Sequence, residues 1–163
     1  MSKKILALAA VVAIAAAAGS AAAAGHTRHA RHRANVTLHK TKLGKVLASS
    51  KGRTLYLYTP DARNKSNCYG SCAAAWPPLL TKGKPRVGAG LKKGLLGVTM
   101  RKDGKHQITY AGHPLYLFTG DSRAGQANGE NYGGIWFVLN AAGHQVKPKS
   151  SSGTTTTGGG GGY

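Results

Sequence analysis

The sequence predicts an all-β domain built from two related repeats of about 60 residues each. Residues 52–61 (GRTLYLYTPD) recur as residues 112–121 (GHPLYLFTGD), and Trp76 recurs at the same spacing as Trp136. Both copies alternate leucine with aromatic residues, which is typical of β-strands, and no segment carries a long helical period. The constant spacing of the matches indicates an internal duplication within one small domain.

Residues 1–24 have the features of a cleaved export signal. Lys3 and Lys4 precede an apolar run at residues 5–18, and small residues follow up to Ala24. The run is shorter than the ~20 apolar residues that a membrane-spanning helix needs. We therefore expect cleavage near Ala24 and a secreted or cell-envelope location, and the lack of a nearby cysteine predicts that no lipid anchor is attached there.

The chain after this signal is strongly basic. It carries 21 Lys and Arg against four acids, a net charge of +17. Residues 25–35 form a basic arm that we expect to be disordered, with His26, His29 and His32 as weak candidate metal ligands, because the neighbouring arginines oppose a cation. Residues 147–163 form a Ser-, Thr- and Gly-rich sequence typical of a flexible tail.

The domain itself is predicted at residues 36–146, with repeats at about 44–82 and 98–143. The first half should hold a strand or strand pair at 36–49, the clearest strand at 53–59, a polar loop at 62–70 and one helical turn at 71–76, before Pro77 and Pro78. A basic linker follows at 83–97. The second half should hold a hairpin at 96–101 and 105–110, strands at 114–119 and 135–140, and a glycine-rich loop at 125–134.

Cys68 and Cys72 occur only in the first repeat, where the constant spacing matches them to Asn128 and Tyr132 of the second. Outside the cytoplasm so close a pair is most simply a disulfide. Their C-x-x-x-C spacing differs from redox and haem-attachment motifs, and two thiols alone cannot build a four-cysteine zinc site. We therefore predict a disulfide that shapes the loop between Asp61 and Trp76, and we expect any functional specialisation there first.

Four motifs carry a family resemblance. They are L-Y-x-[FY]-x-x-D at residues 55–61, C-x-G-x-C-A-x-x-W-P-P at 68–78, Q-x-T-Y-x-G-x-P-L-Y-x-F-x-x-D at 107–121 and G-G-x-W-F at 133–137. Together they resemble the bacterial secreted-repeat lipoproteins defined by a Tyr-x4-Asp motif, a family of unknown function. The resemblance implies a secreted protein built from tandem repeats, often lipid-anchored, although the anchoring cysteine is lacking in this sequence.

The duplicated Tyr-x4-Asp pairs, Tyr56 with Asp61 and Tyr116 with Asp121, are the sharpest candidate site residues. If a twofold axis relates the repeats, the two carboxylates could meet across it and perturb each other or hold a cation. Alternatively, each aspartate accepts backbone N–H bonds in the loop after its strand, which we favour. Trp76 and Trp136 are expected in the core, with a stacking platform for a planar ligand as the alternative.

The sequence lacks the signatures of Ser-His-Asp hydrolases, phosphate-binding glycine loops and sequence-specific nucleic-acid readers. We therefore expect a non-enzymatic binding module without a cofactor, adsorbing to anionic cell-wall polymer or a membrane surface. A cationic bias without a dedicated partner would also explain the charge. The alternative function is an envelope metal-binding or redox-associated protein that uses the His arm, the cysteines and the duplicated Tyr and Asp.

Overall fold

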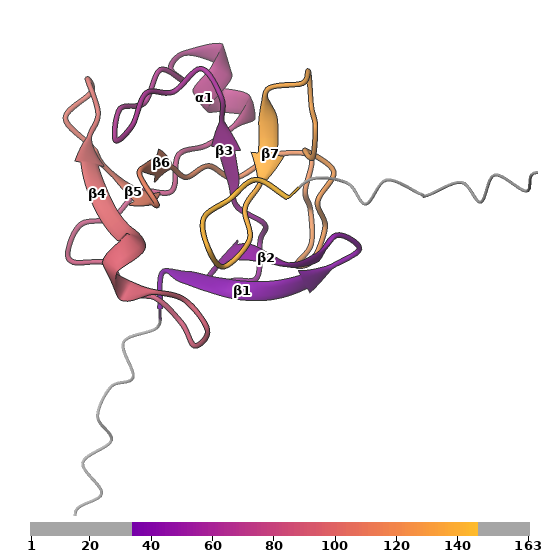
Figure 1. Cartoon of the computed structure of the whole chain (residues 1–163). Coiled ribbons are helices and arrows are strands. Elements are labelled where there is room, and N and C mark those ends of the chain that lie inside the picture. Colours follow the sequence, from indigo (N-terminus) through magenta and orange to yellow (C-terminus); the bar gives the residue numbers. More distant parts are fainter. Residues whose placement is uncertain (1–33, 147–163) are drawn as a thin grey trace, which may run out of the picture. The chain divides into compact units, whose positions relative to one another are not determined.

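The computed structural model describes residues 34–146 (Figure 1). The elements are β1 (Val36–Thr41), β2 (Gly44–Ser49), β3 (Tyr56–Tyr58), the short helix α1 (Ser71–Ala75), the 3-10 turn η1 (Lys93–Leu95), β4 (Leu96–Met100), β5 (His106–Tyr110), β6 (His113–Pro114) and β7 (Trp136–Val138). Strands dominate, which confirms the all-β prediction. The predicted signal, most of the basic arm and the predicted tail lie outside the described residues. No helix within residues 34–146 is long and apolar enough to cross a membrane.

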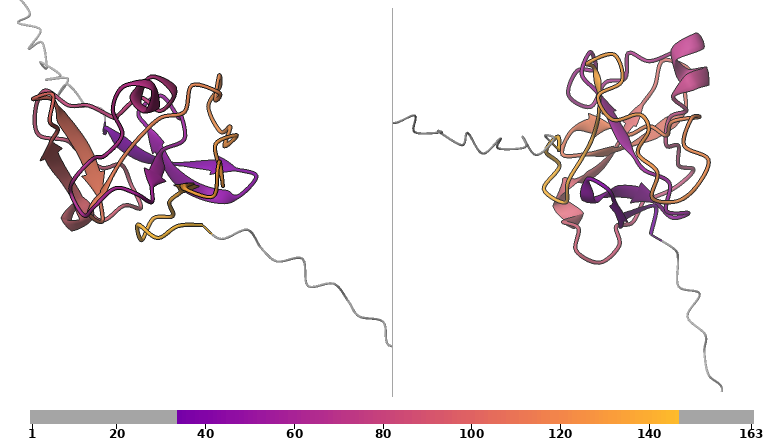
Figure 2. Two further views of the ribbon diagram at one scale, coloured as in Figure 1. Left: turned by 90° about the horizontal axis from the view of Figure 1, so that it is seen from above. Right: turned by 90° about the vertical axis from the view of Figure 1, so that its right-hand side faces the viewer.

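The strands form three small antiparallel sheets. β1 pairs with β2, β4 pairs with β5 and β5 with β6, and β3 pairs with β7 from the far end of the domain sequence. The β1–β2 hairpin lies at one end of the domain and α1 at the opposite end, with β3 and β7 between them (Figures 1 and 2). The expected hairpin at 96–101 and 105–110 is therefore present as β4 and β5.

The strands expected at 53–59 and 114–119 are assigned only in part, because each extended segment changes partners along its length. Thr54 bridges Ala48, whereas Tyr56 bridges Tyr116 and begins the pairing with β7. In the second copy, residues 116–118 lie along Pro77 and Pro78. Proline has no N–H to donate, so this pairing stops at an isolated bridge instead of a regular ladder.

An approximate twofold axis passes between Tyr56 and Tyr116. The N–H of each residue donates to the carbonyl of the other, at N···O distances of 2.9 and 3.0 Å. The flanking bonds match as well: Thr59 N–H donates to Ile135 O (2.9 Å), and Thr119 N–H donates to Ala75 O (3.0 Å). Each repeat therefore pairs its central strand with the tryptophan segment of the other repeat.

We call the two segments that carry Tyr56 and Tyr116 the axis strands. Two buried clusters fill the domain on either side of them. Leu55 and Leu57 point into an aliphatic cluster, and Tyr56 between them points into an aromatic one. Successive residues of a strand face opposite sides, so the alternation read from the sequence sorts them in this way. The aromatic cluster is completed by Val46, Cys68, Trp76, Tyr116, Ala127, Trp136 and Val138.

Candidate functional site

The two predicted Tyr-x4-Asp pairs are exchanged between the repeats. Tyr56 O–H donates to Asp121 Oδ2 and Tyr116 O–H donates to Asp61 Oδ2, both at 2.6 Å. No tyrosine is bonded to the aspartate of its own motif among these contacts. The exchange follows from the twofold pairing of the axis strands, which directs each phenol across to the loop that ends the other repeat's strand.

The second oxygen of each aspartate holds its own loop. Asp61 Oδ1 accepts the N–H of Asn67 (2.7 Å), and Asp121 Oδ1 accepts the N–H of Asn128 (2.9 Å). Both asparagine side chains donate in turn to the carbonyl before the aspartate, Pro60 O and Gly120 O. The carboxylates thus act as the turn acceptors that we favoured, each with an added phenol from the other repeat.

These bonds correct one part of the repeat alignment. Asn128 is the structural counterpart of Asn67, not of Cys68, because both asparagines make the same two bonds. The second loop has one more residue between its aspartate and asparagine than the first, and one fewer before its tryptophan. The constant spacing of the strands and tryptophans concealed this shift, which puts Gly129 in the place of Cys68.

The two pairs differ in their surroundings. Asp121 is only 1% exposed, whereas Asp61 is partly exposed. Burial raises the pKa of Asp61, opposed by its hydrogen bonds from Tyr116 and Asn67 and by the Arg101 charge. Burial, followed by the bonded carboxylate, also raises the pKa of both Tyr56 and Tyr116. Both phenols therefore stay protonated at neutral pH and are weaker acids than a free tyrosine.

Arg101 is a buried residue of this site that the sequence did not reveal. It is 4% exposed, and its Nη1 donates to Ser66 Oγ (2.8 Å) and Gln107 Oε1 (2.6 Å). Ser66 Oγ lies 2.7 Å from Tyr116 Oη, and since Tyr116 donates to Asp61, Ser66 is the donor. Once Asn67 and Asn128 are aligned, the counterpart of Ser66 is Ala127, so the second copy has no hydroxyl at this position.

Four rings from both repeats form a continuous stack. Trp76 and Trp136 lie face to face, with centroids 3.9 Å apart and planes at 3°. Tyr58 covers the outer face of Trp136 (4.3 Å), and its counterpart Phe118 covers that of Trp76 (4.2 Å). Both indoles are at most 4% exposed, so they belong to the core and their faces offer no platform to a planar ligand.

Each axis tyrosine also meets an indole edge to face. The centroid of Tyr56 lies 5.2 Å from that of Trp76, and Tyr116 repeats this contact with Trp136 at the same distance. Tyr132, from the loop before β7, packs against both Trp76 and Phe118 at 5.7 Å and is 57% exposed. The indoles of the stack are therefore buried, whereas the phenol of Tyr132, which contacts the stack, lies at the surface.

Cys68 and Cys72 form the predicted disulfide at the start of α1. Neither sulfur is then available as a thiolate ligand. Among residues 34–146, no group of three or more His, Cys, Asp or Glu side chains lies close enough together to hold a metal ion. His26, His29 and His32 lie outside the described residues.

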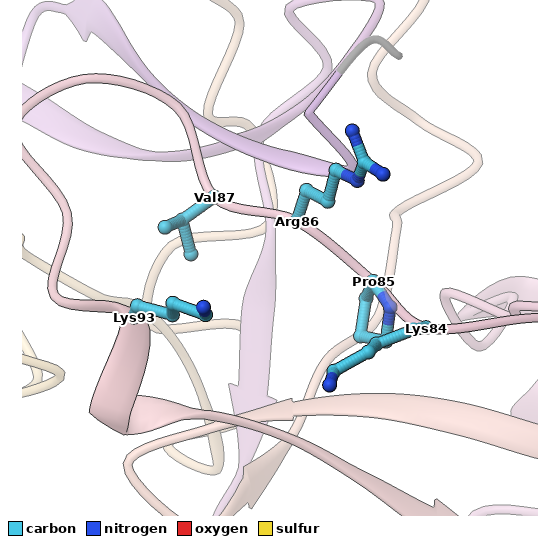
Figure 3. Close-up of a pocket in the computed structure, with 5 residues that line it drawn as sticks. All are labelled: Lys84, Pro85, Arg86, Val87 and Lys93. Carbon is cyan, nitrogen blue, oxygen red and sulfur yellow. The ribbon is translucent and has the colours of Figure 1, made fainter.

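A basic band runs over the segment that joins the repeats. It consists of three adjoining hollows with Lys82, Lys84, Arg86, Lys93, Lys105 and His106 in their linings. The first, of about 410 Å³, is lined by Lys84, Pro85, Arg86, Val87 and Lys93, which are drawn in Figure 3. The other two, of about 320 and 600 Å³, share Lys82 and His106 and add Val98 and Leu80.

Comparison with known proteins supports the resemblance seen in the motifs. A family model described as a secreted repeat of unknown function matches twice, at residues 37–80 and 97–140. No curated protein and no solved structure matches. The two matches cover the two related halves, and the description agrees with export from the cytoplasm. The chain therefore belongs to the family of secreted repeats of unknown function.

Proposed function

We propose that the domain is a non-enzymatic binding module that adsorbs to anionic polymers of the cell envelope through the basic band. The observation that carries this proposal is the lining of its three hollows, which includes five Lys or Arg side chains and one histidine but no acid. A row of cations fits a ligand whose negative charges repeat along a chain, as phosphate or carboxylate polymers do.

The distribution of the acidic residues also supports the basic band as the binding surface. Residues 34–146 contain sixteen Lys and Arg against four acids, a net charge of +12. In this part of the chain the ion pairs all use one acid, Asp103, which lies 3.5 Å from Arg101 Nε and 3.7 Å from Lys105 Nζ. Only the Lys105 end of the basic band is therefore neutralised, and Lys84, Arg86 and Lys93 are exposed.

The non-enzymatic part of the proposal rests on what the carboxylates already do. Asp61 and Asp121 each hold a phenol and a backbone N–H, and Asp103 pairs with two cations. Glu130 Oε2 accepts the Val138 N–H (2.7 Å), while its buried Oε1 has no partner and burial raises the pKa of this carboxyl. A lone carboxyl supplies half of an acid–base pair.

The test compares two triple charge reversals that change the net charge equally. One converts Lys84, Arg86 and Lys93 to Glu in the basic band, and the control converts Lys40, Lys42 and Lys45 to Glu on the β1–β2 hairpin. Binding to purified anionic wall polymer is measured from low salt to about 0.5 M, where exposed charges are largely screened. We expect the first variant to lose binding and the control to retain most of it.

Two results would count against the proposal. Absence of binding by the unmodified protein at low salt would remove it, because exposed charges are then unscreened. Equal weakening by both variants would show that net charge, not the basic band, drives adsorption. Binding that persists at about 0.5 M salt would in contrast indicate specific contacts in the hollows.

A further inference from the structure

Five rings in contact connect two buried phenols with the protein surface. We call them the aromatic centre; they belong to Tyr56, Trp76, Tyr116, Tyr132 and Trp136. From exposed Tyr132 the path leads to Trp76 at 5.7 Å and on to Tyr56 at 5.2 Å. A branch crosses from Trp76 to Trp136 at 3.9 Å and reaches Tyr116 at 5.2 Å. No step between neighbouring centroids exceeds 5.7 Å. Indole and phenol are among the most easily oxidised side chains, and electron transfer is fastest between rings in contact.

Each end of this path has a proton acceptor in place. A phenol that loses an electron becomes a strong acid, so its oxidation is easiest where a base already holds the proton. Tyr56 O–H donates to Asp121 and Tyr116 O–H donates to Asp61, both at 2.6 Å. A buried phenol needs a hydrogen-bond acceptor, and in both pairs that acceptor is a carboxylate, which can also take up the proton.

We propose that the aromatic centre is a one-electron relay that carries oxidising equivalents from Tyr132 to the Tyr56–Asp121 pair. A one-electron oxidant at the surface, such as an oxygen-centred radical, gains one electron. That electron comes from Tyr56 through Trp76 and Tyr132, which end the step unchanged. The phenolic O–H bond of Tyr56 breaks, and its proton passes to Asp121 Oδ2. The products are a neutral tyrosyl radical, a neutral carboxylic acid and the reduced oxidant.

The Tyr56–Asp121 pair is better suited than the Tyr116–Asp61 pair to form and hold the radical. Tyr116 Oη accepts a hydrogen bond from Ser66, which the cationic Arg101 holds in place. The Arg101 charge also acts on Asp61 and favours its ionised form, which opposes transfer of the proton from Tyr116. Among residues 34–146 no cation pairs with Asp121, and its 1% exposure shields the pair from reductants in solution.

The test oxidises the exported chain, with its disulfide intact, by photogenerated tris(bipyridyl)ruthenium(III). Electron paramagnetic resonance should show a long-lived tyrosyl radical, and an infrared difference spectrum should show a newly protonated carboxyl. Tyr56→Phe should lose the long-lived radical, whereas the matched Tyr116→Phe should keep it. Tyr132→Phe should slow its formation, and Tyr69→Phe, a tyrosine that packs on Arg101 outside the stack, should leave the rate unchanged.

The proposal is overturned if the long-lived radical persists in Tyr56→Phe, or if oxidation of the unmodified protein protonates no carboxyl. An unchanged formation rate in Tyr132→Phe would remove the assigned entry point. The infrared measurement and a slower reaction in D2O need only the unmodified protein, so they decide the question even if Tyr56→Phe does not fold. Oxidation that yields only cross-links between exposed tyrosines would likewise contradict the relay.

Discussion

The exchanged tyrosine–aspartate pairs predict that two chemically identical substitutions, Asp121→Asn and Asp61→Asn, lower the free energy of unfolding by unequal amounts. Each carboxylate accepts two hydrogen bonds, from a phenol and from an asparagine N–H. An asparagine side chain has one acceptor oxygen, so in either variant one of the two donors loses its partner. The difference lies in whether water can replace that partner.

Asp121 is 1% exposed, so the orphaned donor in Asp121→Asn stays buried. An unsatisfied buried donor costs ~1–3 kcal/mol, and a bond to a charged group contributes ~1.5–3 kcal/mol. We therefore expect Asp121→Asn to lower the free energy of unfolding by ~2–3 kcal/mol, or the melting temperature by roughly 10 °C or more. Asp61 is partly exposed, so water can satisfy its orphaned donor, and we expect Asp61→Asn to cost ~0.5–1 kcal/mol.

Urea unfolding of both variants with the disulfide intact measures this difference, and Tyr56→Phe completes a double-mutant cycle with Asp121→Asn. Tyr56 and Asp121 should show a coupling free energy above ~0.5 kcal/mol, as residues in direct contact do. Equal losses in the two variants, or additivity between Tyr56 and Asp121, would refute the reasoning. The slope of the unfolding line should stay constant, because a changed slope would mean that another state had formed.

Three further outcomes follow from individual contacts. Burial, with the charges of Arg63 and His144, lowers the pKa of His113 below 6.5, so the folded state binds fewer protons than the unfolded one. Stability should therefore fall as the pH drops from 6.5 through the lowered pKa, and His113→Gln should remove this part of the loss in urea titrations over that range. A Cβ at Gly129 would lie 2.5 Å from the Trp76 ring, so Gly129→Ala should cost ~1–3 kcal/mol, while Gly83→Ala, which meets open space, should be near neutral in the same thermal melts. Reduction of the Cys68–Cys72 disulfide, which closes a very short loop, should lower the free energy of unfolding by only ~2 kcal/mol or less, as measured with and without reductant.

Much of the fold was predictable because the duplication supplied the same information twice. The copies of residues 52–61 and 112–121 fixed the spacing of the two axis strands, and Asp103 with Gly104 marked the β4–β5 turn. The alternation of Leu55, Tyr56 and Leu57 predicted a strand, and the structure buries its two faces in different clusters. These features depend on local chain geometry, which periodicity records.

The exchange of partners was not predicted, because the Tyr-x4-Asp spacing suggests a contact inside each motif. Five residues of extended chain reach up to ~17 Å, so an extended strand that begins at Tyr56 carries its own aspartate out of reach. Only a second copy in antiparallel contact brings a carboxylate back to the phenol. This reach argument was available in the sequence, whereas the burial of Arg101 depends on three-dimensional packing that no local pattern reports.

The loops that follow Asp61 and Asp121 differ in the contacts that hold them and in the side chains that they expose. The first loop, where the cysteines had suggested specialisation, is held by the disulfide, by the bond from Arg101 to Cys68 O and by the bond from Asn67 to Asp61. The second loop has Gly129 where the first has Cys68, and the absent side chain leaves the space that the Trp76 ring occupies. The same loop then presents Tyr132 to solvent against that ring. The first loop is therefore held by covalent and polar bonds, whereas the second packs its backbone on Trp76 and carries the exposed ring that contacts it.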